Sequence, residues 1–145
     1  MDGKDGTKSY SVGLNSITVT EKTSTYNFKE QRKRIKDWAK ANIVGKEINI
    51  PSKGWNVAIT VSGIKESLNQ PHKHYYHKNE LIKNIEEALI NSVYLESKID
   101  STGDQNNVFH YMKTMVNGEE SYFVLRETKK DGMIILYSIV DKIKK

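Results

Sequence analysis

The chain has 145 residues, a length that suits one domain with a single hydrophobic core. No apolar run approaches the roughly 20 residues of a membrane-spanning helix, and the start carries no signal-peptide pattern. Cysteine is absent, which excludes disulfides and thiolate metal sites. Together these features predict a cytoplasmic location. The formal net charge of +5 favours acidic partners, nucleic acid first among them.

Small and polar residues dominate the start of the chain. Residues 1–25 are rich in Gly, Ser, Thr and Lys, and we interpret them as a flexible lead-in or linker with a short edge strand at Ile17–Thr20. The domain then covers residues 26–145. Apolar residues near one stripe predict a helix over Tyr26–Val44, and Gly45 supplies its stop.

The middle of the chain alternates between extended and helical patterns. Lys46–Ile50 is expected to be extended, and apolar alternation predicts a strand over Trp55–Val61. Ser62 can cap a short helix that ends before Pro71. A polar aromatic loop or an irregular helix start follows at His72–Lys78.

Asn79 is the expected cap of an amphipathic helix that carries Leu81, Ile85 and Leu89 inward. We predict that these three side chains are buried together with Trp38, Ile59 and Leu125.

The last third predicts an antiparallel meander. The Asn117-Gly118 pair is the strongest short hairpin signal, and Asp131-Gly132 marks the next turn. The expected strands are Val93–Ile99, Val108–Val116, Ser121–Glu127 and Met133–Val140, with a loop over Ser101–Asn107. The fold class is therefore α+β, with N-terminal helices packed on an antiparallel meander of four or more strands.

Two-residue turns would fix the register of this meander. Met112 should then oppose Phe123, Leu125 should oppose Ser138, and Arg126 should oppose Tyr137. The expected core face carries Met112, Phe123, Leu125, Leu136 and Val140, and the other face carries Phe109, Tyr111, Lys113, Tyr122, Arg126 and Tyr137. The second face is either a nucleic-acid platform, with rings for bases and cations for phosphates, or an ordinary solvated face.

Three of the four histidines lie within His72–His77. They form a poor metal site, because His72 and His74 point apart in an extended chain and no acidic or sulfur ligand stands beside them at helical spacing. They are better placed as acid–base groups, with Lys73 and Lys78 available to hold a phosphate. The alternative is a solvent-exposed loop.

Lys65 and Glu66 follow a predicted strand, where a lysine can bind phosphate and a glutamate can act as a base; ordinary helix-start decoration is the alternative. The chain has no glycine-rich phosphate loop and no clustered carboxylates for metal-dependent phosphoryl chemistry. Any hydrolysis of nucleic acid would therefore be metal-independent and act on RNA, whose 2′-hydroxyl is an internal nucleophile.

The order of these elements resembles a known family. The run Trp38–Gly45, the run Gly54–Glu66, the histidine loop with its following helix, and the closing Leu136-Tyr-Ser138 resemble domains of large polyvalent proteins from phages and conjugative elements. The resemblance covers residues 30–142 and places the chain in the barnase–EndoU–colicin–RelE class of small nucleases. It implies helices packed on a four-stranded antiparallel sheet and metal-free RNA cleavage.

Two functions follow as hypotheses. The first is a toxin-like or effector ribonuclease that uses no metal or cofactor, with RNA as substrate and an immunity protein as a possible partner. Its predicted catalytic residues are His74, His77, Lys65, Arg126 and Tyr137, and its predicted RNA contacts are Arg32, Lys36, Lys73, Lys113 and Tyr122. The second is an inactive module of the same fold that binds RNA or a protein.

Overall fold

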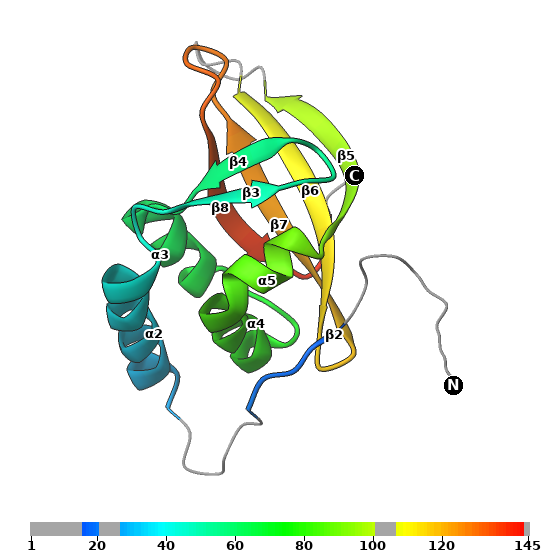
Figure 1. Ribbon diagram of the computed structural model, residues 1–145. Coiled ribbons are helices and arrows are strands. Elements are labelled where there is room, and N and C mark those ends of the chain that lie inside the picture. Colours follow the sequence, from blue (N-terminus) through cyan, green and yellow to red (C-terminus); the bar gives the residue numbers. More distant parts are fainter. Residues whose placement is uncertain (1–15, 21–26, 101–106, 144–145) are drawn as a thin grey trace.

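The computed structural model describes residues 16–20, 27–100 and 107–143. Within these residues, one mixed sheet of seven strands forms the centre of the structure, and helices cover one of its faces (Figure 1). Most of the predicted lead-in and nearly all of the predicted loop at 101–107 lie outside the described residues. None of the described helices is long and apolar enough to cross a membrane.

Helix α2 (Phe28–Asn42) confirms the first predicted helix. The Asn27 side chain caps it by accepting a hydrogen bond from the Glu30 amide at 3.1 Å. Gly45 adopts φ +94°, a conformation that suits glycine and ends the helix as predicted. Ile35 and Ala39 face the core, but Phe28 in the first turn is exposed.

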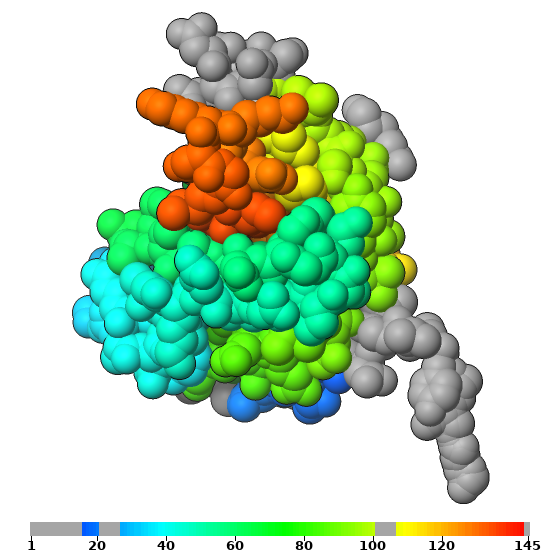
Figure 2. All heavy atoms as spheres, turned by 45° about the horizontal axis from the view of Figure 1, so that its top comes forward, coloured from blue at the N-terminus to red at the C-terminus, as the bar shows by residue number. Residues whose placement is uncertain are grey.

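Strands β3 (Glu47–Ile50) and β4 (Trp55–Ala58) form a hairpin, and helix α3 (Val61–Asn69) follows. The strand from Trp55 ends earlier than predicted, because Thr60 and not Ser62 caps α3 by accepting a hydrogen bond from the Gly63 amide at 3.0 Å. The hairpin crosses the helix-covered side of the sheet. Figure 2 shows it as a band of surface between the orange β7–β8 region and the green helices.

The predicted helix capped by Asn79 is different in the structure. Helix α4 (Tyr75–Leu81) starts before Asn79, a short 3₁₀ turn η1 (Ile82–Asn84) follows, and α5 (Ile85–Ile90) completes the segment. Asn79 is fully buried inside α4, and its amide donates to the Gln31 side chain of α2 at 3.1 Å. A polar residue that resembles a cap is thus used as an interhelical contact.

The predicted meander is confirmed by β5 (Val93–Asp100), β6 (Asn107–Val116), β7 (Glu119–Glu127) and β8 (Ile134–Val140), each antiparallel to the next. The sheet is larger than a meander. Strand β4 runs parallel to β8, and β2 (Ser16–Ile17) runs parallel to β6. Ile17 and Val19 are buried, so the described part of the predicted lead-in packs on the sheet.

The first hairpin has the predicted register, with Met112 opposite Phe123. Its turn residues Asn117 and Gly118 both have positive φ, at +48° and +79°.

The predicted register of the second hairpin is wrong. The β7–β8 connection is longer than two residues, so Leu125 pairs with Leu136 and Val124 pairs with Ser138. A bulge at Tyr137 absorbs the extra residue. Val140 consequently leaves the core face, and Ile139 is buried in its place.

The core lies between the helices and the sheet. Ile59, Leu81, Ile85, Leu89 and Leu125 are buried there as predicted, whereas Trp38 packs on the cluster while partly exposed.

Candidate nucleic-acid interface

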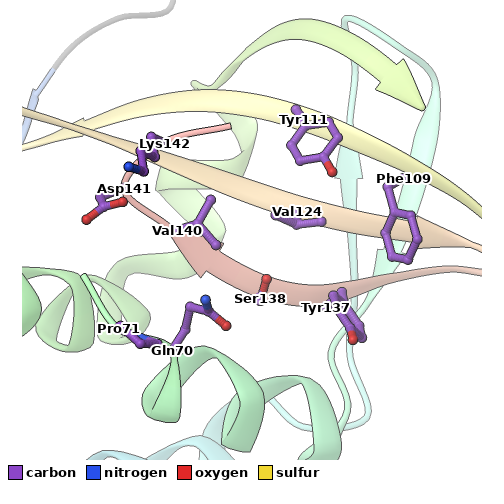
Figure 3. Close-up of a pocket in the computed structure, with 10 residues that line it drawn as sticks. All are labelled: Gln70, Pro71, Phe109, Tyr111, Val124, Tyr137, Ser138, Val140, Asp141 and Lys142. Atoms are coloured by element: carbon purple, nitrogen blue, oxygen red, sulfur yellow. The ribbon is translucent and has the colours of Figure 1, made fainter. Parts of the chain in front are cut away.

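The face of the sheet opposite the helices carries a pocket of about 500 Å³. Its walls come from strands β6, β7 and β8 and from the segment after α3. The lining residues include Phe109, Tyr111, Val124, Tyr137, Ser138, Val140, Gln70 and Pro71. We call this the open-face pocket. Figure 3 shows three aromatic rings at one end and Gln70 reaching from the end of α3 toward Ser138.

The bulge in β8 builds the aromatic end of this pocket. It lets Tyr137 and Ser138, two successive residues, both line the pocket, whereas a regular strand would direct one of them to the core. The Tyr137 ring lies 5.5 Å from the Phe109 ring, and the Arg126 guanidinium lies 5.3 Å from the Tyr137 centroid. Rings beside a cation are a surface on which bases can stack and a phosphate can bind.

Arg126 is poorly satisfied by the protein itself. Its Nε atom is buried and has no hydrogen-bond partner among the described residues. A buried guanidinium N–H usually has an acceptor, so this Nε is an unpaired donor inside the protein, and a ligand beside the rings would have to meet the guanidinium at its other nitrogens.

A second group of predicted contacts lies toward the β6–β7 turn. Glu120 accepts a hydrogen bond from the Tyr122 hydroxyl at 2.7 Å and forms an ion pair with Lys113 at 3.1 Å. Burial, and then the bond to Glu120, raise the pKa of Tyr122 to about 12, so the phenol stays protonated. Lys113 and Tyr122 are therefore neighbours, but a carboxylate offsets the lysine charge.

The predicted histidine site folds into a network on the other side of the sheet. His74 Nδ1 and His77 Nδ1 each lie 2.9 Å from a Glu119 carboxylate oxygen. His72 Nε2 lies 3.0 Å from the hydroxyl of Ser121. Ser121 is fully buried and points to the same face of β7 as the core residue Phe123. Burial lowers the pKa of His72 to about 4, so this imidazole is neutral at pH 7.

The two lysines beside the histidines have different roles. Lys73 is exposed, and its backbone N–H donates to Asp141 at 2.7 Å, which holds the histidine loop against the end of β8. Lys78 is fully buried, donates to the carbonyls of Ser67 and Leu68, and faces the Tyr75 ring at 4.4 Å. Burial, and then the nearby Arg32 charge, lower the pKa of Lys78 to about 7. Lys78 fixes the end of α3 and cannot reach a surface phosphate.

Lys65 lies on a third surface of the protein, between α2 and α3. It lines a groove of about 450 Å³ between α2 and α3 together with Arg32 and Lys36. Arg32 is held in position because its guanidinium donates to the Tyr75 hydroxyl at 3.0 Å, and that hydroxyl donates to the Leu68 carbonyl.

The structure thus brings some predicted residues together and separates others. Arg126 and Tyr137 share the open face, His74 and His77 share Glu119, and Lys65 lines the α2–α3 groove. These are three different surfaces. The described residues contain no group of three histidine, cysteine or acidic side chains arranged to hold a metal ion.

Sequence reasoning missed three polar features. Gln70 lines the open-face pocket, Glu119 joins two histidines, and His110 lies between Ser97 Oγ at 2.6 Å and Glu127 Oε1 at 2.7 Å under the Trp55 ring. The register of the first hairpin predicts His110 opposite Leu125, as observed, on the core face where a histidine needs polar partners; only those partners were missed. Only the tertiary fold locates Gln70 and Glu119.

No curated protein and no solved structure matches the chain. The family model for large polyvalent protein-associated domain 3 matches residues 26–137, which is most of the chain and includes every strand except β2 and the end of β8. The chain therefore belongs to the large polyvalent protein-associated domain 3 family.

Proposed function

We propose that this domain of a polyvalent protein binds single-stranded RNA in the open-face pocket. The observation that carries the proposal is the cluster of Phe109, Tyr111 and Tyr137 around a cavity of about 500 Å³, with Arg126 beside the rings. Unpaired bases stack on aromatic side chains, and each such contact contributes roughly 1–3 kcal/mol.

The polar groups in and beside the pocket can contact an RNA ligand whose bases stack on the rings. Gln70 offers an amide that can pair with the edge of a base, and Ser138 offers a hydroxyl. Arg126 contributes a cation beside the Tyr137 ring. The net charge of +5 also favours the binding of a polyanion such as RNA.

The test is the binding of a labelled single-stranded RNA, measured by fluorescence anisotropy at two salt concentrations. Tyr137→Ala should weaken binding about 5- to 100-fold, because it removes one stacking ring. Tyr137→Phe keeps the ring and is the matched control, which should bind like the wild type. If the wild type and Tyr137→Ala bind RNA with equal affinity, RNA does not bind in the open-face pocket.

Metal-independent RNA cleavage, as in a toxin-like or effector domain, is the second candidate. The observation in its favour is the contact between His74 and Glu119. A carboxylate on Nδ1 fixes the tautomer with a proton there and leaves Nε2 as the proton acceptor, which is what the attack of a 2′-hydroxyl needs. His74 is 31% exposed, so a substrate can approach it, and an immunity protein would be expected to cover it.

Cleavage is tested separately from binding by incubating total RNA with the protein in EDTA. If His74 is the general base, His74→Ala should slow cleavage about 10²- to 10⁴-fold while leaving binding nearly intact. His77→Ala provides a comparison on the same carboxylate. A wild-type protein that binds RNA and leaves it intact in EDTA would exclude this candidate and leave the binding module.

A further inference from the structure

A basic groove lies next to the open-face pocket. Helices α2 and α3 line it with six cations and one carboxylate, and that carboxylate, Asp37, is already paired with Lys33 at 2.9 Å. The cations are Lys29, Arg32, Lys33, Lys36, Lys40 and Lys65. Such an excess of one charge concentrates the potential of a groove and attracts a polyanion.

The cations of this groove do little for the fold. Lys29, Lys33, Lys40 and Lys65 are exposed, and the residues that hold α2 on the core are Ile35 and Ala39 on its other side. Arg32 is the exception, because Tyr75 holds its guanidinium in place at the groove. A fixed guanidinium among lysine ammonium groups is a suitable arrangement for consecutive phosphates.

The groove and the pocket meet at one peptide bond. Asn69, the last residue of α3, lines the groove, and Gln70, the next residue, lines the open-face pocket. Gln70 has an extended conformation, with φ −66° and ψ 128°, so the chain leaves the helix at this point. Successive Cα atoms lie about 4 Å apart, so the linings of the two sites adjoin at this point of the chain.

We propose that one strand of RNA occupies both sites, with unpaired bases in the open-face pocket and the following phosphates in the α2–α3 groove. This inference rests on the proposed function. It adds a path for the RNA across the surface, a minimum RNA length for full affinity, and a separate role for each of the two sites. The pocket supplies stacking, which depends little on salt, and the groove supplies charge, which depends on it strongly. The C-terminal end of α3 is the ridge that the strand crosses.

The path predicts that affinity depends on the length of the RNA. OB-fold domains that bind single strands occupy about 4–16 nucleotides each, and on that scale RNAs of about 3 and about 12 nucleotides separate the two sites. The longer RNA should reach the groove, and the shorter one should fill only the pocket. Each should be measured by anisotropy over a salt series with the full chain.

The groove is tested with the double variant Lys36→Gln, Lys65→Gln. Loss of two phosphate contacts should lower the slope of log affinity against log salt by about 1.4 and weaken the longer RNA about tenfold or more at low salt. The shorter RNA should bind unchanged. The control is Lys46→Gln, Lys83→Gln, which removes the same charge from exposed lysines of a different depression and should change neither RNA.

Three results would overturn the path. If the groove variant binds the longer RNA like its control while Tyr137→Ala weakens both lengths, the proposed function stands and the path is wrong. If the groove variant weakens both lengths equally, the groove acts on its own and not as an extension of the pocket. If Tyr137→Ala affects neither length, the proposed function itself fails, and with it the path.

Discussion

The two faces of the sheet use similar residues in opposite ways. On the helix-covered face, histidines are tied to the chain itself, as His72 is to Ser121 and His110 is to Ser97 and Glu127. On the open face, the Arg126 guanidinium lies beside the Tyr137 ring, and its buried Nε has no hydrogen-bond partner among the described residues. The difference teaches that the fold, and not the residue type, decides which polar side chains are held within the protein and which lie beside a pocket that a ligand can fill.

The faces should differ most in how their aromatic residues affect stability. Phe123 is fully buried on the helix-covered face, so Phe123→Ala should lower the free energy of unfolding by about 3–5 kcal/mol. Phe109 is half-buried on the open face, so Phe109→Ala should cost clearly less and should instead weaken RNA binding. Chemical denaturation measures both values. Equal losses of stability would mean that the open face belongs to the core.

The contact between α3 and β8 positions Gln70 at the pocket. A Cβ on Gly63 would overlap the carbonyl oxygen of Leu136, so Gly63→Ala should push the helix from the strand and destabilise the protein by about 1–3 kcal/mol. RNA affinity should fall as well, because Gln70 moves with the helix. Ser62→Ala is the neighbouring control, since Ser62 is exposed and should tolerate the change. An unchanged midpoint for Gly63→Ala would contradict this packing.

The sequence predicted the fold best where local chemistry decides it. Asn117-Gly118 adopts positive φ at both positions because that pair favours it, and the register from Met112 to Phe123 follows. Asp131-Gly132 failed as a guide because the connection is longer and Tyr137 forms a bulge, which depends on how β8 pairs with β7. The cap assigned to Asn79 failed because its partner, Gln31, is distant in the sequence.

The candidate site was predictable only in part for the same reason. Alternation along β6 and β7 placed Phe109, Tyr111 and Arg126 on one face without tertiary information. The separation of His74 from Arg126 depends on which side of the sheet the α3–α4 connection reaches, and the chain alone does not encode that in any local pattern. Gln70 entered the pocket because α3 packs on β8 through Gly63, a close contact between distant segments.

The neutral state of His72 predicts a pH dependence on the helix-covered face. Burial lowers the pKa of His72 from 6.5 to about 4, while the charges of Asp141 and Glu119 oppose the shift and those of Lys78 and His74 add to it. Between pH 6.5 and about 4, His72 takes up a proton in the unfolded chain but stays neutral in the folded protein. The stability due to neutral His72 is therefore complete above pH 6.5 and is lost as pH falls toward 4. The melting temperature of the wild type should therefore fall more steeply across this range than that of His72→Gln. Parallel curves would contradict a buried neutral imidazole.

Glu119→Gln should change stability least of these variants, and it tests most directly whether the two faces of the sheet have separate roles. Glu119 is 31% exposed and contacts two partly exposed histidines, so Glu119→Gln should lower stability by only about 0–1 kcal/mol. RNA binding should be unchanged, because Glu119 lies on the other side of the sheet from Tyr137. If the domain also cleaves RNA in EDTA, the same variant should slow cleavage at full binding, since His74 would lose the carboxylate that fixes its tautomer. A loss of binding as large as that of Tyr137→Ala would show that one ligand contacts both faces, and the assignment of binding to the open face alone would be wrong.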